Sequence, residues 1–301
     1  MSVSTKKIKG YEIKPPKKSA FQIETPSDQI RLHTLLVASG KRGGGKSVAV
    51  SNLCAKLIEQ GVLDRVILIS PTYFSNKEIF ANLNIDEEED VLEPEKDVVK
   101  TVIQKVEDDK KDYEEFVEKL KKWRMFQKMM KSKKPINMLD PALLVEFMEL
   151  GFLDNTSETM EKPKWKYKHE RPPIIMLIID DAMGTPLFNP KSGLVNLCIK
   201  HRHVAKGMGL STCLLVQSYC AVGGIPRPIR ENCTVALFFK CKDDNQIKRI
   251  HAEIGADVDV EQFDKMYKFA TEQPYGFLMV DFHPKEKEQM FRKNFDEYLT
   301  V

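Results

Sequence analysis

The sequence predicts an α/β fold, a mostly parallel β-sheet with helices on both faces. Six apolar runs are of a length typical of buried strands, at 30–38, 65–70, 174–179, 210–216, 235–240 and 276–282. Helical patterns separate most of them, and strands that alternate with helices form covered parallel sheets. A chain of 301 residues is long enough for one such domain with an insertion.

A glycine-rich loop follows the first of these strands. It fits the pattern G-x-x-x-x-G-K-S/T and consists of Gly40, Lys41, Arg42, Gly43, Gly44, Gly45, Lys46 and Ser47. A helical pattern at 48–58 comes next, so the loop lies between a strand and a helix N-terminus, as a phosphate-binding loop must. We expect Lys46 to reach the β- and γ-phosphates of a nucleotide and Ser47 to bind Mg²⁺. Lys41 and Arg42 add positive charge inside the loop.

Polar residues follow two of the later strands. Asp180 and Asp181 end one apolar run, and Gln217 ends the next. Because the carboxyl ends of parallel strands meet at one edge of a sheet, these side chains are expected beside the loop. We predict that Asp180 holds Mg²⁺ and that Asp181 acts as the base or polarises the attacking water. Gln217 would point at the γ-phosphate or at that water.

The overall composition excludes several classes of protein. A net charge of +3 is too small to indicate nucleic-acid binding by itself. No apolar run approaches the ~20 residues of a membrane span, and the N-terminus lacks the apolar core of a signal peptide. The six cysteines are scattered without a C-x-x-C pair, which predicts reduced thiols in a cytosol-like compartment and no structural zinc.

Two stretches depart from the strand-and-helix pattern of the predicted 29–301 domain. Residues 1–28 are rich in lysine and predict a basic N-terminal arm, either a solvated terminus or a partner-binding segment. Residues 86–171 open acidic, become lysine-rich, and predict a charged helical insertion. Its apolar residues between 99 and 130 recur at spacings of three, four or seven, which predicts an amphipathic helix or helix pair. A further helix is predicted at 142–150.

The motifs, taken in order, resemble a known family. The phosphate-binding loop is followed by Ile69-Ser70-Pro71-Thr72-Tyr73, Ile178-Ile179-Asp180-Asp181, Arg202-His203, Leu214-Leu215-Val216-Gln217-Ser218-Tyr219, Ile225-Pro226 and Ile229-Arg230-Glu231-Asn232. This series resembles the poxvirus-type genome-packaging ATPases of large DNA viruses and their smaller relatives, within the FtsK–HerA superfamily of DNA-pumping motors. The resemblance covers roughly residues 30–282 and leaves the insertion outside it. The Arg-His, Gln-x-Tyr and Arg-x-Asn series is its discriminating part.

The resemblance implies a P-loop NTPase of the RecA/FtsK-like type. Such a protein would be a homo-oligomeric ring that hydrolyses ATP to drive double-stranded DNA into a preformed capsid, with a capsid vertex or portal-type partner. It would act at the assembly site in the host-cell cytoplasm, with the virion as a second place. Gln217 matches the polar sensor of the superfamily. Arg202 matches the usual place of an arginine finger that acts on the neighbouring subunit, and Arg230 is the second choice.

Three alternatives stay open on the sequence. The first is a DNA translocase or helicase of the same superfamily that acts in DNA transfer or segregation. The second is a P-loop kinase, which would carry arginines in a lid, whereas the 86–171 stretch holds only Arg124 and Arg171. The third is a nucleotide-gated binding module without catalysis, which would be expected to lose Lys46 or Asp180.

Overall fold

A nine-stranded sheet forms the centre of the molecule in the computed structural model, which describes residues 23–131, 140–152, 162–220, 224–241, 244–254 and 258–300. The strand order is β3-β2-β4-β5-β1-β6-β7-β8-β9, parallel from β3 to β6 and antiparallel from β7 onward. The strands are β1 (Leu35–Ser39), β2 (Arg65–Ile69), β3 (Val91–Leu92), β4 (Ile175–Asp180), β5 (Ser211–Val216), β6 (Val235–Phe239), β7 (Phe277–Asp281), β8 (Phe291–Lys293) and β9 (Glu297–Tyr298). The predicted fold class is therefore confirmed, and each of the six predicted strands is present. The short strands β3, β8 and β9 were not predicted.

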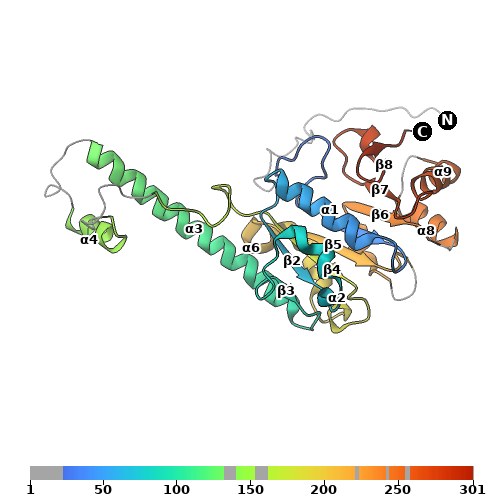
Figure 1. Cartoon of the computed structure of the whole chain (residues 1–301), viewed down its shortest axis with the longest axis horizontal. Helices are drawn as coiled ribbons and strands as arrows, with labels where there is room; N and C mark the ends of the chain where they lie inside the picture. Colours follow the sequence, from blue (N-terminus) through green and yellow to red (C-terminus); the bar gives the residue numbers. More distant parts are fainter. Residues whose placement is uncertain are drawn as a thin grey trace, which may run out of the picture.

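Helices cover both faces of this sheet (Figure 1). They are α1 (Lys46–Glu59), α2 (Tyr73–Phe80), α3 (Val98–Lys131), α4 (Pro141–Glu149), α5 (Leu194–Lys200), α6 (Val204–Gly207), α7 (Arg227–Glu231), α8 (Asp244–Ile254) and α9 (Val260–Ala270). Successive strand side chains point to opposite faces. Leu36 accordingly belongs to the buried cluster that includes residues of α1 and α2, whereas Leu35 belongs to the cluster on the other face, which includes residues of α3, α5, α7, α8 and α9. Both faces of the central strands are buried, which explains their continuous apolar runs.

The stretch predicted as an insertion has two parts. Near the sheet, β3 pairs with β2, and Val98, Val99, Val102 and Val106 of α3 are buried in the core. Farther along, α3 leaves the sheet and carries α4 near its end (Figure 1). The amphipathic pattern thus forms one helix rather than a pair. Among the described residues, no helix is both long and apolar enough to cross a bilayer.

Of the predicted basic arm, residues 1–22 lie outside the described part of the chain. The predicted domain bounds at 29–301 and 86–171 stay predictions.

The strand register brings the sequence-distant motifs to one edge. Ser39 of β1 is aligned with Val216 of β5, and Asp180 of β4 is aligned with Leu215. The Gly40 N–H also donates to the Val216 carbonyl at 3.1 Å. Since β5 lies between β1 and β4, Gln217 follows a strand that separates the phosphate-binding loop from the paired aspartates.

Candidate functional site

The glycine loop turns sharply between β1 and α1 and depends on glycine at two positions. A Cβ on Gly40 would lie 2.5 Å from the Cβ of Phe239, closer than two non-bonded carbon atoms can approach. Gly45 is the N-cap of α1 with φ of 95°, a left-handed conformation that glycine adopts without strain. The chain therefore enters α1 with its free backbone N–H groups directed at the loop, which is the geometry that binds anions.

The two predicted nucleotide-contacting side chains that follow Gly45 lie at the start of α1. The Lys46 ammonium donates to the carbonyl oxygens of Gly40 at 2.8 Å and Lys41 at 3.0 Å, so it folds back over the loop. The Ser47 hydroxyl donates to Asp180 Oδ2 at 2.8 Å across 133 residues of sequence. The structure therefore brings the two predicted Mg²⁺ ligands within hydrogen-bond distance of each other.

Burial acts on both charges of this site. It raises the pKa of Asp180, and the opposing effects of the Ser47 hydrogen bond and the Lys46 charge do not cancel it. Burial also lowers the pKa of Lys46, although Asp180 and Asp181 act in the other direction. Each group thus lacks the counter-charge that would offset its desolvation. A bound cation at Asp180 and a bound phosphate at Lys46 would supply those counter-charges.

The site fits a metal ion that is shared with a phosphate chain. In the described ranges, no group of three or more histidine, cysteine or acidic side chains is arranged to hold a metal ion by itself. Mg²⁺ is commonly bound by one or two protein oxygens together with waters and substrate phosphates. The Ser47 hydroxyl and the Asp180 carboxylate are oxygen ligands of this kind.

The other two predicted residues of this edge follow β4 and β5. Asp181 has φ of 50°, a left-handed conformation that few side chains other than Asn and Asp tolerate, and its side chain is half-buried. This turn directs the chain away from the strand directly after Asp180. Gln217 is exposed at the end of β5. Both follow strands that end beside the loop, and both keep side-chain surface open to solvent.

A cleft beside the loop was not predicted from the sequence. It is about 500 Å³ in volume and mainly apolar, and its lining includes Gly45, Val48, Pro274, Tyr275 and Phe295. The Tyr275 side chain is 70% exposed, and a Cβ on Gly45 would lie 3.1 Å from it. The sequence feature that could have predicted this cleft is the turn-forming run Gln273-Pro274-Tyr275-Gly276 before the last predicted strand. The antiparallel direction of β7 places that turn beside the loop.

The two candidate finger arginines lie elsewhere, along one cleft. Arg202 is exposed in the turn at His201–His203, and a second cleft joins it to His33 and Thr234 just before β1 and β6. It therefore lies at the amino edge of the sheet, opposite the loop. The five residues of β1 separate the two edges by about 16 Å. Arg202 cannot reach the loop of its own chain over that distance.

Arg230 is held by contacts within the chain. Its guanidinium donates to both carboxylate oxygens of Glu253 at 2.7 and 2.9 Å and lies 5.8 Å from the Tyr219 ring centre. The hydrogen bond to Glu253 raises the pKa of Arg230. Among the described residues, Arg202 forms no such ion pair. Arg202 is thus the better placed of the two for contact with another subunit.

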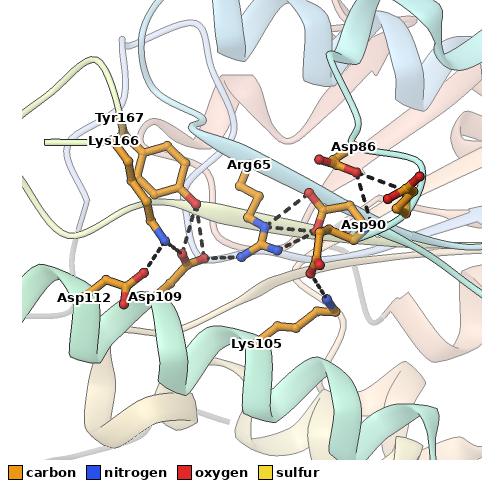
Figure 2. A network of polar contacts seen from close by, with 10 residues as sticks. Arg65, Asp86, Asp90, Lys105, Asp109, Asp112, Lys166 and Tyr167 are labelled. Atoms are coloured by element: carbon orange, nitrogen blue, oxygen red, sulfur yellow. Dashed lines mark hydrogen bonds and ion pairs between the residues drawn. The ribbon is translucent and has the colours of Figure 1, made fainter.

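A buried network of charges occupies another part of the amino edge (Figure 2). Arg65, at the start of β2, lies between Asp90 and Asp109, with a 2.6 Å contact to each. Asp109 also accepts from Tyr167 at 3.1 Å and pairs with Lys166 at 2.6 Å. Burial alone would lower the pKa of Arg65, but the hydrogen bonds to the two carboxylates outweigh it and raise the pKa. The network ties α3 and the returning segment near residue 167 to the sheet.

Comparison with known proteins yields remote structural similarities. No family model and no curated protein matches the sequence. Among solved structures, the chain is similar to the genome packaging NTPase B204 from Sulfolobus turreted icosahedral virus 2 in complex with ATP-gammaS, with 14% identity over 83% of this chain and 93% of that one and a TM-score of 0.41. It is also similar to the pCW3 conjugation coupling protein TcpA, with 16% identity over 87% of this chain and 63% of that one and a TM-score of 0.42. A third similar structure is EssC (ATPases 2 and 3) from Geobacillus thermodenitrificans, with 13% identity over 83% of this chain and 38% of that one and a TM-score of 0.38.

A genome-packaging protein is thus among the structures similar to this chain.

Proposed function

We propose that this protein is an ATP-hydrolysing motor that translocates double-stranded DNA and packages a viral genome into a preformed capsid. The observation that carries the proposal is the 2.8 Å contact between Ser47 of the glycine loop and Asp180 at the end of β4. It joins the two halves of a nucleoside-triphosphate site from segments 133 residues apart. The motif order after Asp181 supports the step from an ATPase to a DNA motor.

Each residue of the carboxyl edge has a role in this proposal. The backbone N–H groups of the loop and Lys46 bind the phosphate chain, with the Lys46 ammonium moving from its loop carbonyls to the β- and γ-phosphates. Ser47 and Asp180 would hold Mg²⁺, which supplies charge neutralisation on the phosphates when bound. Gln217 orients the attacking water, and Asp181 accepts its proton.

The cleft beside Gly45 is the proposed place of the nucleotide base. Its volume of about 500 Å³ and its apolar lining suit a purine, and the exposed Tyr275 ring offers a stacking surface. The loop and this cleft share Gly45, so one nucleotide can occupy both.

A ring of subunits completes the proposal. Arg202 lies at the edge of the sheet opposite its own loop, so it would act on the nucleotide of the next subunit and couple hydrolysis to the arrangement of the ring. DNA would be the substrate of that ring, with a capsid vertex or portal-type partner, at the assembly site in the host-cell cytoplasm.

The direct experiment is the ATP hydrolysis rate of the purified chain with and without double-stranded DNA, beside a mass measurement of the assembly. We expect hydrolysis that duplex DNA stimulates, from an oligomer. A monomer whose ADP formation is independent of DNA but rises with a small-molecule acceptor, which becomes phosphorylated, would support a kinase instead. Hydrolysis that DNA stimulates, without uptake of DNA into empty capsids, would favour a translocase of DNA transfer or segregation.

A further inference from the structure

The far end of α3 has an unusual distribution of charge. Residues 98–118 hold four basic and seven acidic side chains, whereas residues 119–131 hold six basic and no acidic ones. The end of α3 that lies away from the sheet in Figure 1 is therefore basic, whereas the part before it carries a net negative charge. A charged face that only serves solubility mixes both signs, so this separation requires another explanation.

Four of these cations form a row on one face of the helix. Lys121, Arg124, Lys128 and Lys131 are spaced by three, four and three residues, which places them within a sector of about 80° over ~15 Å of helix axis. All four are exposed. In the part of the chain that the structure describes, none of them forms an ion pair. We call these four residues the basic row.

The opposite face of the same helix is covered. Phe126, about 180° from the middle of the basic row, is buried and lies 5.2 Å from Phe147 of α4 and 5.9 Å from Phe152, measured between ring centres. Lys122, outside the row, forms an ion pair with Glu146 of α4. The packing of α4 thus fixes the rotation of α3 and leaves the basic row facing outward.

We propose that the basic row binds the phosphate backbone of double-stranded DNA. The proposal rests on the proposed function, because it assumes that duplex DNA is the substrate. The cations lie about 5 Å apart along a rigid axis, and the duplex presents one phosphate per ~3.4 Å on each strand, so the row can face several successive phosphates. The row contains only lysine and arginine, which contact phosphates without reading the base sequence. Such binding suits a motor that must move along any sequence.

The test compares two variants of the full chain that lose the same charge. The first carries Lys121→Gln, Arg124→Gln, Lys128→Gln and Lys131→Gln. The matched control carries Lys77→Gln, Lys96→Gln, Lys100→Gln and Lys111→Gln, four exposed lysines nearer the sheet. Affinity for a fluorescent duplex of about 30 base pairs is measured by anisotropy at several salt concentrations. ATP hydrolysis without DNA is measured in parallel.

We expect the basic-row variant to bind the duplex at least about tenfold more weakly at ~0.1 M salt, and the slope of log K against log salt to become flatter by roughly three to four. The control should stay within about twofold of the wild type, and hydrolysis without DNA should be unchanged in both variants. A third variant with Lys121→Arg, Lys128→Arg and Lys131→Arg keeps the charge and should bind as the wild type does.

Equal affinity and slope for the basic-row variant and the wild type would overturn the inference, as would an equal loss in the control. A wild-type chain that binds the duplex through the row but hydrolyses no ATP would instead contradict the proposed function alone.

Discussion

The two edges of the sheet differ in how they hold a buried cation, Lys46 at one edge and Arg65 at the other. At the carboxyl edge, burial raises the pKa of Asp180 and lowers that of Lys46, because neither has a sufficient partner within the chain. At the amino edge, Asp90 and Asp109 bind Arg65 on both sides and its pKa is raised, although burial still raises the pKa of Asp90. The buried cation of the carboxyl edge therefore lacks a counter-charge that a bound phosphate can supply, whereas Arg65 has its counter-charges within the chain.

The same comparison distinguishes arginines that stabilise the fold from the arginine that we propose acts in catalysis. Arg65, Arg171 and Arg230 all have carboxylate partners, namely Asp90 with Asp109, Asp64, and Glu253. Arg202 lies at the same edge and forms no ion pair among the described residues. Under the proposed function, we expect Arg202 to contact the nucleotide bound by the next subunit of the ring.

The largest expected effect comes from removing that arginine. Arg202→Ala should reduce ATP turnover by ~10³-fold, because an arginine finger stabilises charge only in the transition state. Mixing Arg202→Ala subunits with Lys46→Ala subunits should recover part of the hydrolysis, since some sites then pair an intact loop with an intact arginine. Specific activity should also rise with protein concentration.

Arg230→Ala is the comparison for this prediction. It should destabilise the chain through Glu253 but keep turnover in the folded fraction. If Arg230→Ala abolishes turnover and recovers it on mixing while Arg202→Ala stays active, the finger is Arg230.

The second effect concerns stability. Arg65→Ala leaves two buried carboxylates with fewer partners, so we expect a loss of about 3 kcal/mol in the free energy of unfolding, measured by urea denaturation. Arg227→Ala is the control, since Arg227 pairs with Glu231 on the surface and should cost less than about 0.5 kcal/mol. Turnover per folded chain should be unchanged for Arg65→Ala. A loss of turnover without a loss of stability would give the network a functional role.

The third effect distinguishes the two aspartates. Asp181→Asn should still bind ATP with Mg²⁺ but turn over ~10²-fold more slowly, because a general base acts in the transition state. Asp180→Asn should instead weaken the Mg²⁺-dependent part of ATP affinity. Affinity is measured with and without Mg²⁺, beside turnover. The opposite pattern would exchange the two roles.

The smallest effect is a gain in stability. Because the pKa of Asp180 is raised in the fold, its stabilising contribution is present below its unfolded pKa and is lost as pH rises through the folded value. Asp180→Asn should therefore raise the melting temperature of the nucleotide-free chain at pH 7. Thermal denaturation at pH 7 checks this, and a lower melting temperature would show that the Lys46 and Ser47 contacts outweigh the cost of burial.

Local patterns predicted much of this molecule. The strands, the loop and Asp180 depend on apolar runs, glycine spacing and the residue that ends a strand, and each is visible within a few residues of sequence. The helix pattern of α3 was also visible, but it continues through Val98 and Val102, so nothing local marks where the helix leaves the core.

Contacts between segments that are distant in the sequence could not be predicted from local patterns. The position of β5 between β1 and β4 is a property of the whole sheet. The cleft at Tyr275 exists because β7 runs antiparallel to β6. Arg65 meets Asp109 across 44 residues, and no spacing in the sequence pairs them.

The central claim is that the carboxyl edge holds and hydrolyses a nucleoside triphosphate, and steady-state ATP turnover of Lys46→Ala tests it most directly. Lys56→Ala is the matched control, because Lys56 is an exposed lysine on the same helix and outside the site. We predict that Lys46→Ala loses turnover by ~10²-fold or more at an unchanged melting temperature, while Lys56→Ala hydrolyses ATP as the wild type does. Near-wild-type turnover of Lys46→Ala would contradict the assignment of this loop and of the site built around it.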